Sequence, residues 1–234
     1  MSVNVQKQEL ELSAAVGPQL YRLLRDRIIR GELPPGTRVS ETEFAVAYQV
    51  SRQPVREAFI KLAEENLVMV RPQRGTFVTR ISVPAVMTAR FIREAVEADI
   101  VRRVAEIADT AAIAALEGQI AQQRAVTENA EPSVFMRLDE EFHRMLAQFA
   151  GEDAVWDYLE GLKTQMNRVR HISARQFALD KLVAQHAAIV DAIRNGDAAK
   201  AEGGMRLHLR EIIHDLPDIV RTRPDYFEDV GEGN

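Results

Sequence analysis

The chain has 234 residues, of which 46% are hydrophobic and 28% charged, and it contains no cysteine. This composition is ordinary for a soluble globular protein, and the lack of cysteine excludes disulfides and thiolate metal sites. No apolar stretch approaches the ~20 residues that a membrane-spanning helix needs. The N-terminus also lacks the basic start and long apolar run of a secretory signal, so we expect a cytoplasmic protein.

The formal net charge of −5 hides a difference between two parts of the chain. Residues 1–80 hold 12 Lys and Arg against 9 Asp and Glu, a net of +3, whereas residues 81–234 hold 18 against 26, a net of −8. A basic segment followed by an acidic one indicates two modules with different partners.

The first 80 residues predict a helix, a second helix, a turn, a third helix and a two-stranded hairpin. After a loosely held arm, residues 1–18, apolar positions recur at helical spacing over residues 20–29. A glycine and a Pro-Pro-Gly turn end that helix. Ser40 predicts the cap of the next helix, with Glu43 three residues on as its partner. This order is that of a winged helix-turn-helix domain, which we assign to residues 19–80.

The stretch SRQPVREAFIKL predicts the third helix. Ser51 is a suitable N-cap whose oxygen can accept from a first-turn amide, and Pro54 falls in the first turn, where its missing N–H costs nothing. Arg52 and Arg56 lie four residues apart, on one face of the N-terminal end. A recognition helix points this end into the major groove of DNA.

The hairpin adds basic groups at a second place. Residues 67–70 and 76–78 are strand-like, and the segment between them forms the tip. Arg74 and Gly75 belong to this tip, which in a winged helix lies near the minor groove or the DNA backbone.

A second interpretation treats Arg52 and Arg56 as solvated surface residues paired with Glu41 or Glu57. We favour contacts with phosphates and guanine edges, because the cap, the turn, the hairpin and the positions of the arginines all agree with one layout. For DNA binding, the positive charge at the end of this helix therefore matters more than the net charge of the whole chain.

Three motifs carry a family resemblance: GELPPGTRVSE, VSRQPVREA and RGTFV, between about residues 19 and 80. They resemble the N-terminal domain of GntR-type bacterial transcription regulators. The sequence departs from that family at Thr42, where some members place a DNA-contacting arginine, and at Asn66, where glycine is usual. The resemblance implies that the residues at or near DNA are Arg38, Arg52, Gln53, Pro54, Arg56, Arg74 and Gly75.

From residue 84 onward the pattern predicts an antiparallel bundle of helices, so the fold class is mainly α: a winged helix-turn-helix domain followed by an all-α bundle. The bundle, residues 84–216, is large enough for its own core, and we assign effector and metal binding to it. Residues 217–234 are polar and acidic and predict a loose tail. The expected helices are 84–108, 110–128, 132–150, 153–173, 178–195 and 197–216.

Three histidines and an aspartate lie on inward faces of these helices: Asp139, His143, His186 and His208. Three neutral imidazoles and a carboxylate suit a divalent metal such as zinc, nickel or manganese. Spacing alone leaves the alternative open, in which each buried histidine is satisfied by an ordinary hydrogen bond. The histidines that fall off the apolar faces are His171 and His214.

The stretches LDEEFHRML and AQHAAIVDAIRNGDAAKAEGGMRLHL are similar to the ligand-binding domain of the FadR subfamily, often called FCD. Many members bind metal through an aspartate and three histidines. The resemblance implies that Asp139, His143, His186 and His208 hold a metal here, with zinc as the first choice.

The resemblance also implies an effector, commonly a small organic acid whose carboxylate is held by the metal and an arginine. Arg93 lies on an inward stripe and matches the arginine of the family's first bundle helix. The alternative is that Arg93 only pairs with Glu97, four residues on. Further polar residues near the possible cavity are Asn167, Arg168 and Arg170.

We therefore expect a DNA-binding transcription regulator whose affinity for DNA is controlled by a small carboxylate bound at a metal site. The family implies a repressor and, with the symmetry of DNA, a homodimer on an inverted repeat. The alternative is a metal-dependent enzyme acting on a small organic acid. That alternative leaves the basic N-terminal part unexplained, and no motif offers a general base or a nucleophile.

Overall fold

The structure, a computed structural model, describes residues 10–11, 13–128, 132–173 and 179–228 and divides into two compact units. The first unit contains residues 1–82 and 223–234, and the second contains residues 83–222. The chain therefore leaves the first unit, forms the second and returns. Within the described ranges, no helix combines the length and the apolar character needed to cross a membrane.

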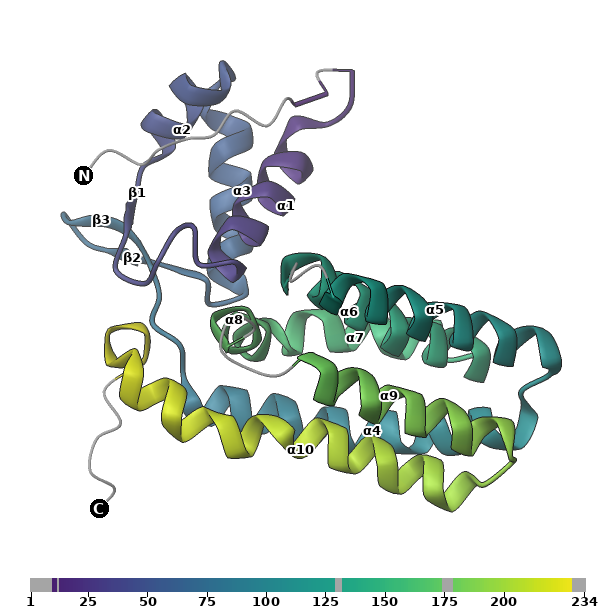
Figure 1. The fold of residues 1–234 in the computed structure, drawn as a ribbon. Helices are drawn as coiled ribbons and strands as arrows, with labels where there is room; N and C mark the ends of the chain where they lie inside the picture. The colour runs from purple at the N-terminus through teal and green to yellow at the C-terminus, as the bar shows by residue number, and fades with distance from the viewer. Residues whose placement is uncertain (1–9, 12, 129–131, 174–178, 229–234) are drawn as a thin grey trace. The chain divides into compact units, whose positions relative to one another are not determined.

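The first unit is a winged helix-turn-helix domain, as predicted (Figure 1). In the sheet, β3 lies in the middle and pairs antiparallel with both β1 and β2. The two-residue strand β1 was not predicted, because so short a segment carries no alternation of polar and apolar residues. The elements are α1 (Val16–Ile29), β1 (Arg38–Val39), α2 (Glu41–Tyr48), α3 (Arg52–Glu64), β2 (Val68–Arg71) and β3 (Gly75–Val78).

Local signals account for most of the helix ends in this unit. Ser40 caps α2 by accepting a hydrogen bond from the backbone N–H of Glu43, and Asn66, where glycine is usual in the family, takes the left-handed conformation after α3, with φ of 55°. Ser51 stands at the N-cap of α3, but its side chain makes no capping hydrogen bond, so that prediction is wrong. A capping oxygen accepts from the second or third helical N–H, and Pro54, the third residue, has none.

The arm before α1 is shorter than predicted. Helix α1 begins at Val16 rather than near Leu20. Gln19 ties the preceding segment to the helix, because its Nε2 donates to the carbonyl of Glu11 at 2.8 Å and its Oε1 accepts from the N–H of Glu11 at 2.9 Å. The rest of the predicted arm, residues 1–9 and 12, lies outside the described residues.

The core of the first unit lies between its helices and the sheet. Because the apolar face of α3 packs into this core, the opposite face of the helix, which carries the arginines, points to solvent. The core side chains include Leu20, Leu24, Phe44, Val55, Phe59, Leu62 and Val78.

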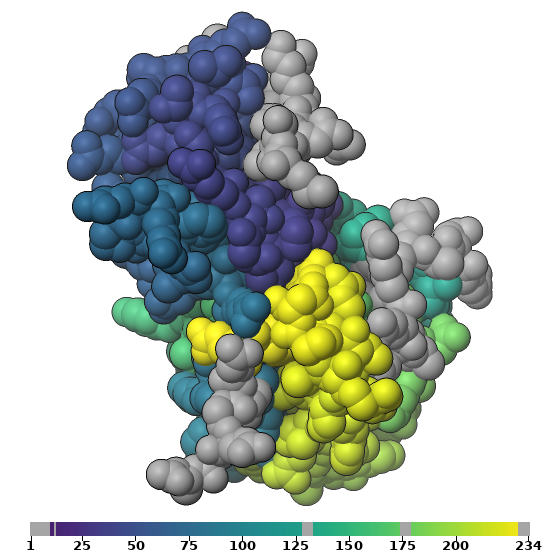
Figure 2. Space-filling model, turned by 90° about the vertical axis from the view of Figure 1, so that its left-hand side faces the viewer, coloured from purple at the N-terminus to yellow at the C-terminus, as the bar shows by residue number. Residues whose placement is uncertain are grey.

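The second unit is the predicted all-helical bundle. In Figure 1, α4 and α10 run side by side along one edge, α9 packs on both, and α5 and α6 complete the bundle. In Figure 2, the yellow and yellow-green atoms at the surface belong to α10 and to the residues that follow it. The elements are α4 (Val83–Ile107), α5 (Thr110–Glu128), α6 (Pro132–Ala150), α7 (Asp153–Leu162), α8 (Thr164–Ser173), α9 (Leu179–Arg194) and α10 (Ala198–Thr222).

One predicted helix, 153–173, is two helices that meet at Lys163. The side chain of Lys163 is only 1% exposed, lies 3.7 Å above the ring of Trp156 and pairs with Glu140 of α6. These partners lie inside the bundle, so the turn brings the lysine inward. Helical periodicity along one segment carries no information about such a contact.

Helix α10 continues past Pro217 to Thr222, although we predicted that it ends before the proline. A proline inside a helix removes one hydrogen bond. Here the buried face continues beyond it, through Leu216 and Ile219, so packing on the bundle outweighs the loss.

The segment that follows α10 is not a loose tail. Residues 223–228, which we call the C-terminal strap, contain a short 3-10 turn, η1 (Pro224–Tyr226). The N–H of Ile81 donates to the carbonyl of Tyr226 at 2.8 Å, and the N–H of Glu228 donates to the carbonyl of Ile81 at 3.0 Å. Phe227 is 1% exposed. The strap is therefore a part of the first unit; residues 229–234 lie outside the described residues.

Candidate functional site

The N-terminal end of α3 presents an exposed polar surface. Arg52, Gln53 and Arg56 are all exposed. Arg52 lies 3.2 Å from Glu41, which is the surface pairing weighed above, and the side chain of this arginine remains 67% exposed. Exposed pairs of this kind contribute ~0–1 kcal/mol, so the guanidinium is available to another partner.

The wing adds two arginines. Arg74 is exposed at the turn between β2 and β3, and Arg38 of β1 lies across the central strand from it. At Gly75 the backbone φ is +106°, and a Cβ would lie 3.0 Å from Nε of Arg38. Only glycine accepts this conformation without strain, so Gly75 lets the Arg38 side chain pass close to the wing.

The predicted metal ligands come together in the core of the bundle. Asp139 and His143 belong to α6, His186 to α9 and His208 to α10, and all four are buried. One ligand atom from each lies within 4.8 Å of the others. The predicted set is thus brought together by three helices.

The three imidazoles face one another through the same ring nitrogen. Nε2 of His208 lies 3.2 Å from Nε2 of His143 and 3.2 Å from Nε2 of His186. The Asp139 carboxylate lies 3.7 Å from Nε2 of His186 and 3.9 Å from Nε2 of His143. One of its oxygens, Oδ1, is buried without a hydrogen-bond partner among the described residues.

The other ring nitrogen of each histidine faces an acceptor. Nδ1 of His186 lies 2.8 Å from Oε1 of Gln123, and that of His208 lies 3.1 Å from Oε1 of Gln185. Nδ1 of His143 lies 2.6 Å from the Glu97 carboxylate but makes no hydrogen bond of good geometry among the described residues. Outer hydrogen-bond partners hold a metal-binding histidine in one tautomer. With the proton on Nδ1 of His186 and His208, their Nε2 lone pairs point at the space that Nε2 of His143 also faces.

This arrangement fits a divalent cation. The Nε2 atoms of His186 and His208, both without a proton and 3.2 Å apart, repel each other unless a positive charge lies between them, and Oδ1 of Asp139 also lacks a partner. Burial lowers the pKa of His186 to about 3 and that of His208 well below its usual value, so both are neutral, as ligands must be. Nitrogen and carboxylate donors together suit zinc, nickel or manganese.

Ion pairs surround the cluster. Asp139 pairs with Arg170, which also reaches Glu140 at 3.1 Å, and Glu140 pairs with Lys163. Burial opposes ionisation of Asp139, but Arg170 and the imidazoles hold its pKa far below the usual range.

On the other side of the cluster, Arg93 pairs with Glu97 at 2.5 Å, and Glu97 in turn contacts His143. The six ionised groups of this shell carry three positive and three negative charges, so a divalent metal would add an uncompensated charge of +2.

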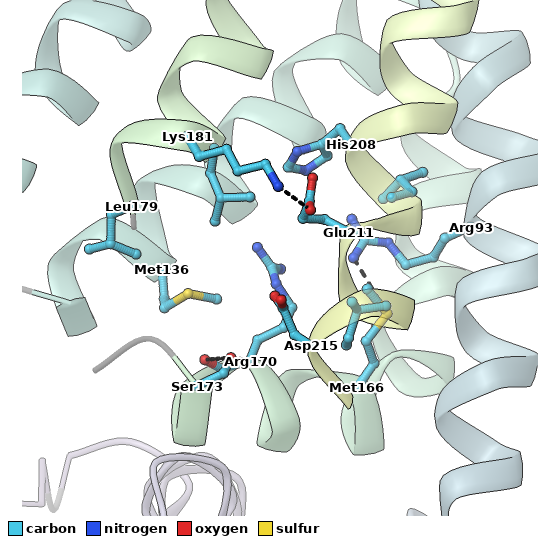
Figure 3. Close-up of a pocket in the computed structure, with 13 residues that line it drawn as sticks. Arg93, Met136, Met166, Arg170, Ser173, Leu179, Lys181, His208, Glu211 and Asp215 are labelled. Atoms are coloured by element: carbon cyan, nitrogen blue, oxygen red, sulfur yellow. Dashed lines mark hydrogen bonds and ion pairs between the residues drawn. The ribbon is translucent and has the colours of Figure 1, made fainter. Parts of the chain in front are cut away.

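A cavity of about 210 Å³ opens beside the cluster (Figure 3). Arg93, Arg170 and His208 line it together with Lys181, Glu211 and Asp215. The polar groups lie at the metal cluster and around Lys181, and much of the remaining wall is apolar. The apolar lining side chains are Met136, Met166, Leu179, Leu182, Leu209 and Ile212.

The contacts of Arg93 are compatible with both of the roles considered for it. It pairs with Glu97, and it also lines the cavity next to the metal cluster. Of the three further residues that we named, only Arg170 lines the cavity; Arg168 is buried against Gln165, and Asn167 lies outside the lining.

Sequence reasoning missed the two glutamines that face the histidines. Gln185 precedes His186 in the chain but contacts His208, and Gln123 lies on α5, 63 residues from His186. No spacing rule links these pairs. The two histidines that fall off the apolar faces, His171 and His214, are absent from the cluster; His214 is exposed, as expected of a surface residue, whereas His171 is half-buried.

Comparisons with known proteins identify the family of both parts of the chain. Residues 17–78 match the family described as bacterial regulatory proteins, gntR family, and residues 89–211 match the FCD domain. The HTH-type transcriptional repressor RspR of Escherichia coli strain K12 is 39% identical over 222 residues, which cover 94% of this chain and 97% of RspR. An HTH-type transcriptional regulator of Streptomyces ambofaciens is 36% identical and covers 89% of this chain and 88% of its own.

Solved structures show the same fold. E. coli McbR/YncC has a TM-score of 0.75 at 17% identity, covering 88% of this chain and 98% of that one. A GntR transcriptional regulator from Rhodococcus sp. RHA1 has a TM-score of 0.71 at 26% identity, covering 88% and 99%. These relatives are transcription regulators and not enzymes, so the metalloenzyme alternative is set aside. The chain belongs to the GntR family of bacterial transcription regulators and carries an FCD domain after its DNA-binding domain.

Proposed function

We propose that the chain is a repressor whose affinity for its operator is set by a small carboxylate bound at a metal site. The observation that carries the proposal is the convergence of three Nε2 atoms and the Asp139 carboxylate beside a cavity lined by Arg93. The DNA-binding part is residues 19–80, and the effector-binding part is residues 84–216.

DNA binding rests on the end of α3 and on the wing. Guanidinium groups pair bidentately with guanine edges and phosphates, and the arginines at both places are exposed. RspR, which is named a repressor, supports the direction of regulation proposed for this chain. Since the target is DNA, we place its action in the cytoplasm. The proposed contact residues are Arg38, Arg52, Gln53, Pro54, Arg56, Arg74 and Gly75.

The active form proposed is a homodimer on an inverted repeat. Two copies related by a twofold axis present two recognition helices to half-sites in successive major grooves. Phe91 of α4 is 65% exposed and Leu207 of α10 is 60% exposed, on two helices that pack together. These side chains support a contact with a second copy over that edge of the bundle.

The metal proposed for the site is zinc, with nickel or manganese as alternatives, and its ligands are Asp139, His143, His186 and His208. A bound metal supplies a positive centre to which a carboxylate oxygen can bind. The hydrogen bonds from Nδ1 of His186 and His208 support this, because they leave the Nε2 lone pairs of both imidazoles facing the cluster.

The effector proposed is a small organic acid. Its carboxylate would meet Arg93 and Arg170 and offset the charge of +2 that the metal adds to a balanced shell. The remaining apolar wall would contact the body of the acid. Such a ligand changes DNA affinity only by binding more tightly to one arrangement of the protein than to the other.

Native mass spectrometry of the full-length protein tests the proposal directly. We expect a dimer that carries one metal ion per chain, and we expect the substitutions His186→Ala and His208→Ala to abolish the metal. His171→Ala and His214→Ala are the matched controls, because neither residue belongs to the cluster. Equal metal in all four variants, measured by elemental analysis, would contradict the site.

A further inference from the structure

A chain of hydrogen bonds joins His208 to the wall of the cavity. Nδ1 of His208 lies 3.1 Å from Oε1 of Gln185, and Nε2 of Gln185 donates to Glu211 at 2.6 Å. Glu211 also pairs with Lys181. Figure 3 shows this last pair on the cavity wall beside the His208 ring.

The chemistry of Glu211 fixes the direction of each bond. Partial burial raises the pKa of Glu211, but Lys181 and Gln185 outweigh it and hold the pKa below its usual value. An ionised carboxylate only accepts hydrogen bonds. Gln185 must therefore turn its NH₂ group toward Glu211 and its oxygen toward His208.

This orientation decides which nitrogen of His208 carries the proton. An amide oxygen only accepts, so Nδ1 of His208 must donate to Gln185. The Nε2 lone pair is then left facing the other two imidazoles. A reversed amide would favour the opposite tautomer, with a proton on Nε2 where the metal belongs.

A glutamine orients His186 in the same way, but here the chain of hydrogen bonds ends at a backbone carbonyl and not at a side chain. Gln123 directs its NH₂ group toward the carbonyl of Leu138, at 3.4 Å, and its oxygen toward His186. A backbone carbonyl is fixed by the helix. Glu211 is instead a side chain at the cavity, so the tautomer of His208 depends on a group that faces the ligand site.

We propose that Gln185 and Glu211 are positioning residues that hold His208 in its metal-binding tautomer. This proposal rests on the metal site of the proposed function. Neither Gln185 nor Glu211 is a ligand of the proposed metal site, and both act on that site through His208. Lys181 keeps Glu211 in place from the outer side.

Nitrogen-15 spectra of histidine-labelled, metal-free, full-length protein provide the first test, because the two ring nitrogens give different shifts in the two tautomers. We expect His208 to be protonated at Nδ1 in the unchanged protein. Gln185→Leu removes the acceptor, and Glu211→Ala releases the amide, so both should move His208 toward the Nε2-protonated form. Gln122→Leu, at an exposed glutamine of α5, is the control and should change nothing.

Zinc affinity provides the second test, through competition with a chelator. The loss of an outer partner of a metal ligand typically weakens metal binding about 10- to 100-fold, and we expect this for Gln185→Leu. The double substitution Gln185→Glu with Glu211→Gln exchanges the two groups and keeps every donor facing an acceptor. It should therefore restore the wild-type tautomer and most of the zinc affinity.

An unchanged His208 tautomer in both Gln185→Leu and Glu211→Ala would overturn the proposal. If Gln185→Leu does not fold, Glu211→Ala decides alone, since it leaves His208 and its acceptor in place. A protein that binds none of zinc, nickel and manganese would refute the metal site of the proposed function. The metal-free spectra would still decide whether Gln185 and Glu211 set the tautomer.

Discussion

Arg93 is shared between a carboxylate of its own helix and the cavity. Its guanidinium is 1% exposed and pairs with Glu97 at 2.5 Å, yet it also forms part of the cavity wall. The pair with Glu97 compensates the buried charge in the absence of an effector. It also fixes the guanidinium in one orientation, which reduces the entropy lost when an acid binds.

We predict that Arg93→Ala weakens binding of the effector acid by at least tenfold. Arg93→Lys should recover little, because lysine cannot form the two-pronged contact of a guanidinium. Calorimetric titration of a panel of small acids and their matching amides into the three proteins measures this. If Arg93→Ala binds the best acid as tightly as wild type, Arg93 serves only as the partner of Glu97.

The exposed arginines of α3 make a separate prediction. Arg52→Ala and Arg56→Ala should each weaken operator binding without changing the unfolding curve. A bidentate contact with guanine is worth ~1–3 kcal/mol of discrimination between bases, whereas loss of a phosphate contact weakens binding to all sequences and lowers the salt dependence by about one unit.

Gel shifts with operator and scrambled DNA at several salt concentrations separate the two cases. Gln122→Ala is the control, since this glutamine is exposed on α5 of the other unit. Unchanged binding in both arginine variants would remove α3 from the DNA interface.

At the scale of the elements, sequence patterns predicted the helices well and their mutual contacts poorly. The inward faces of α6, α9 and α10 follow from helical periodicity, so the four residues of the buried cluster could be found in advance. The partners of those ligands could not. Gln123 reaches His186 from α5, and Lys163 turns inward between α7 and α8. Such contacts depend on how helices distant in sequence pack.

The buried histidines of α9 and α10 predict how the stability of the metal-free bundle depends on pH. The folded-state pKa of His186 is about 3, against 6.5 for a free side chain, and that of His208 is lowered too. At pH values between the folded and the unfolded pKa, these histidines bind protons in the unfolded chain but not in the folded chain. The free energy of unfolding should therefore be greatest above pH 6.5 and fall as the pH decreases, by up to ~1.4 kcal/mol per pH unit for each histidine.

Urea unfolding of chelator-treated protein between pH 7.5 and 5.5 tests this, in a range above the usual pKa values of 3.8 for Asp139 and 4.5 for Glu97 and Glu140, so the carboxylates contribute little to the slope. The fluorescence of Trp156, the single tryptophan, follows the second unit. His186→Gln should flatten the pH dependence, and His214→Gln, at an exposed position, should not. A pH-independent free energy in the wild type would show that these histidines are not kept neutral by burial.

At the scale of the whole molecule, the C-terminal strap changes what counts as the DNA-binding domain. The chain passes between the units twice, after Ser82 and after Thr222. The returning segment pairs with Ile81 and buries Phe227. The first unit is therefore built from both ends of the chain.

We predict that Phe227→Ala destabilises the first unit by roughly 3–5 kcal/mol, the usual cost of deleting a buried phenylalanine side chain. The variant should lose operator affinity at a lower temperature than wild type, while the Trp156 transition of the second unit stays in place. Phe227→Leu, which retains apolar volume, should show a smaller loss. Operator binding that is equally heat-resistant in all three proteins would mean that the strap contributes nothing to the DNA-binding unit.

The double crossing also has a genetic consequence. A nonsense or frameshift mutation at codons 223–227 would leave the buried Asp–His cluster and the cavity intact, because all of their residues precede residue 216. It would instead remove a strand partner from the unit that reads DNA. Lesions in the codons of the strap should thus have the phenotype expected for lesions in the recognition helix, a derepressed operon, and not that of a regulator blind to its effector.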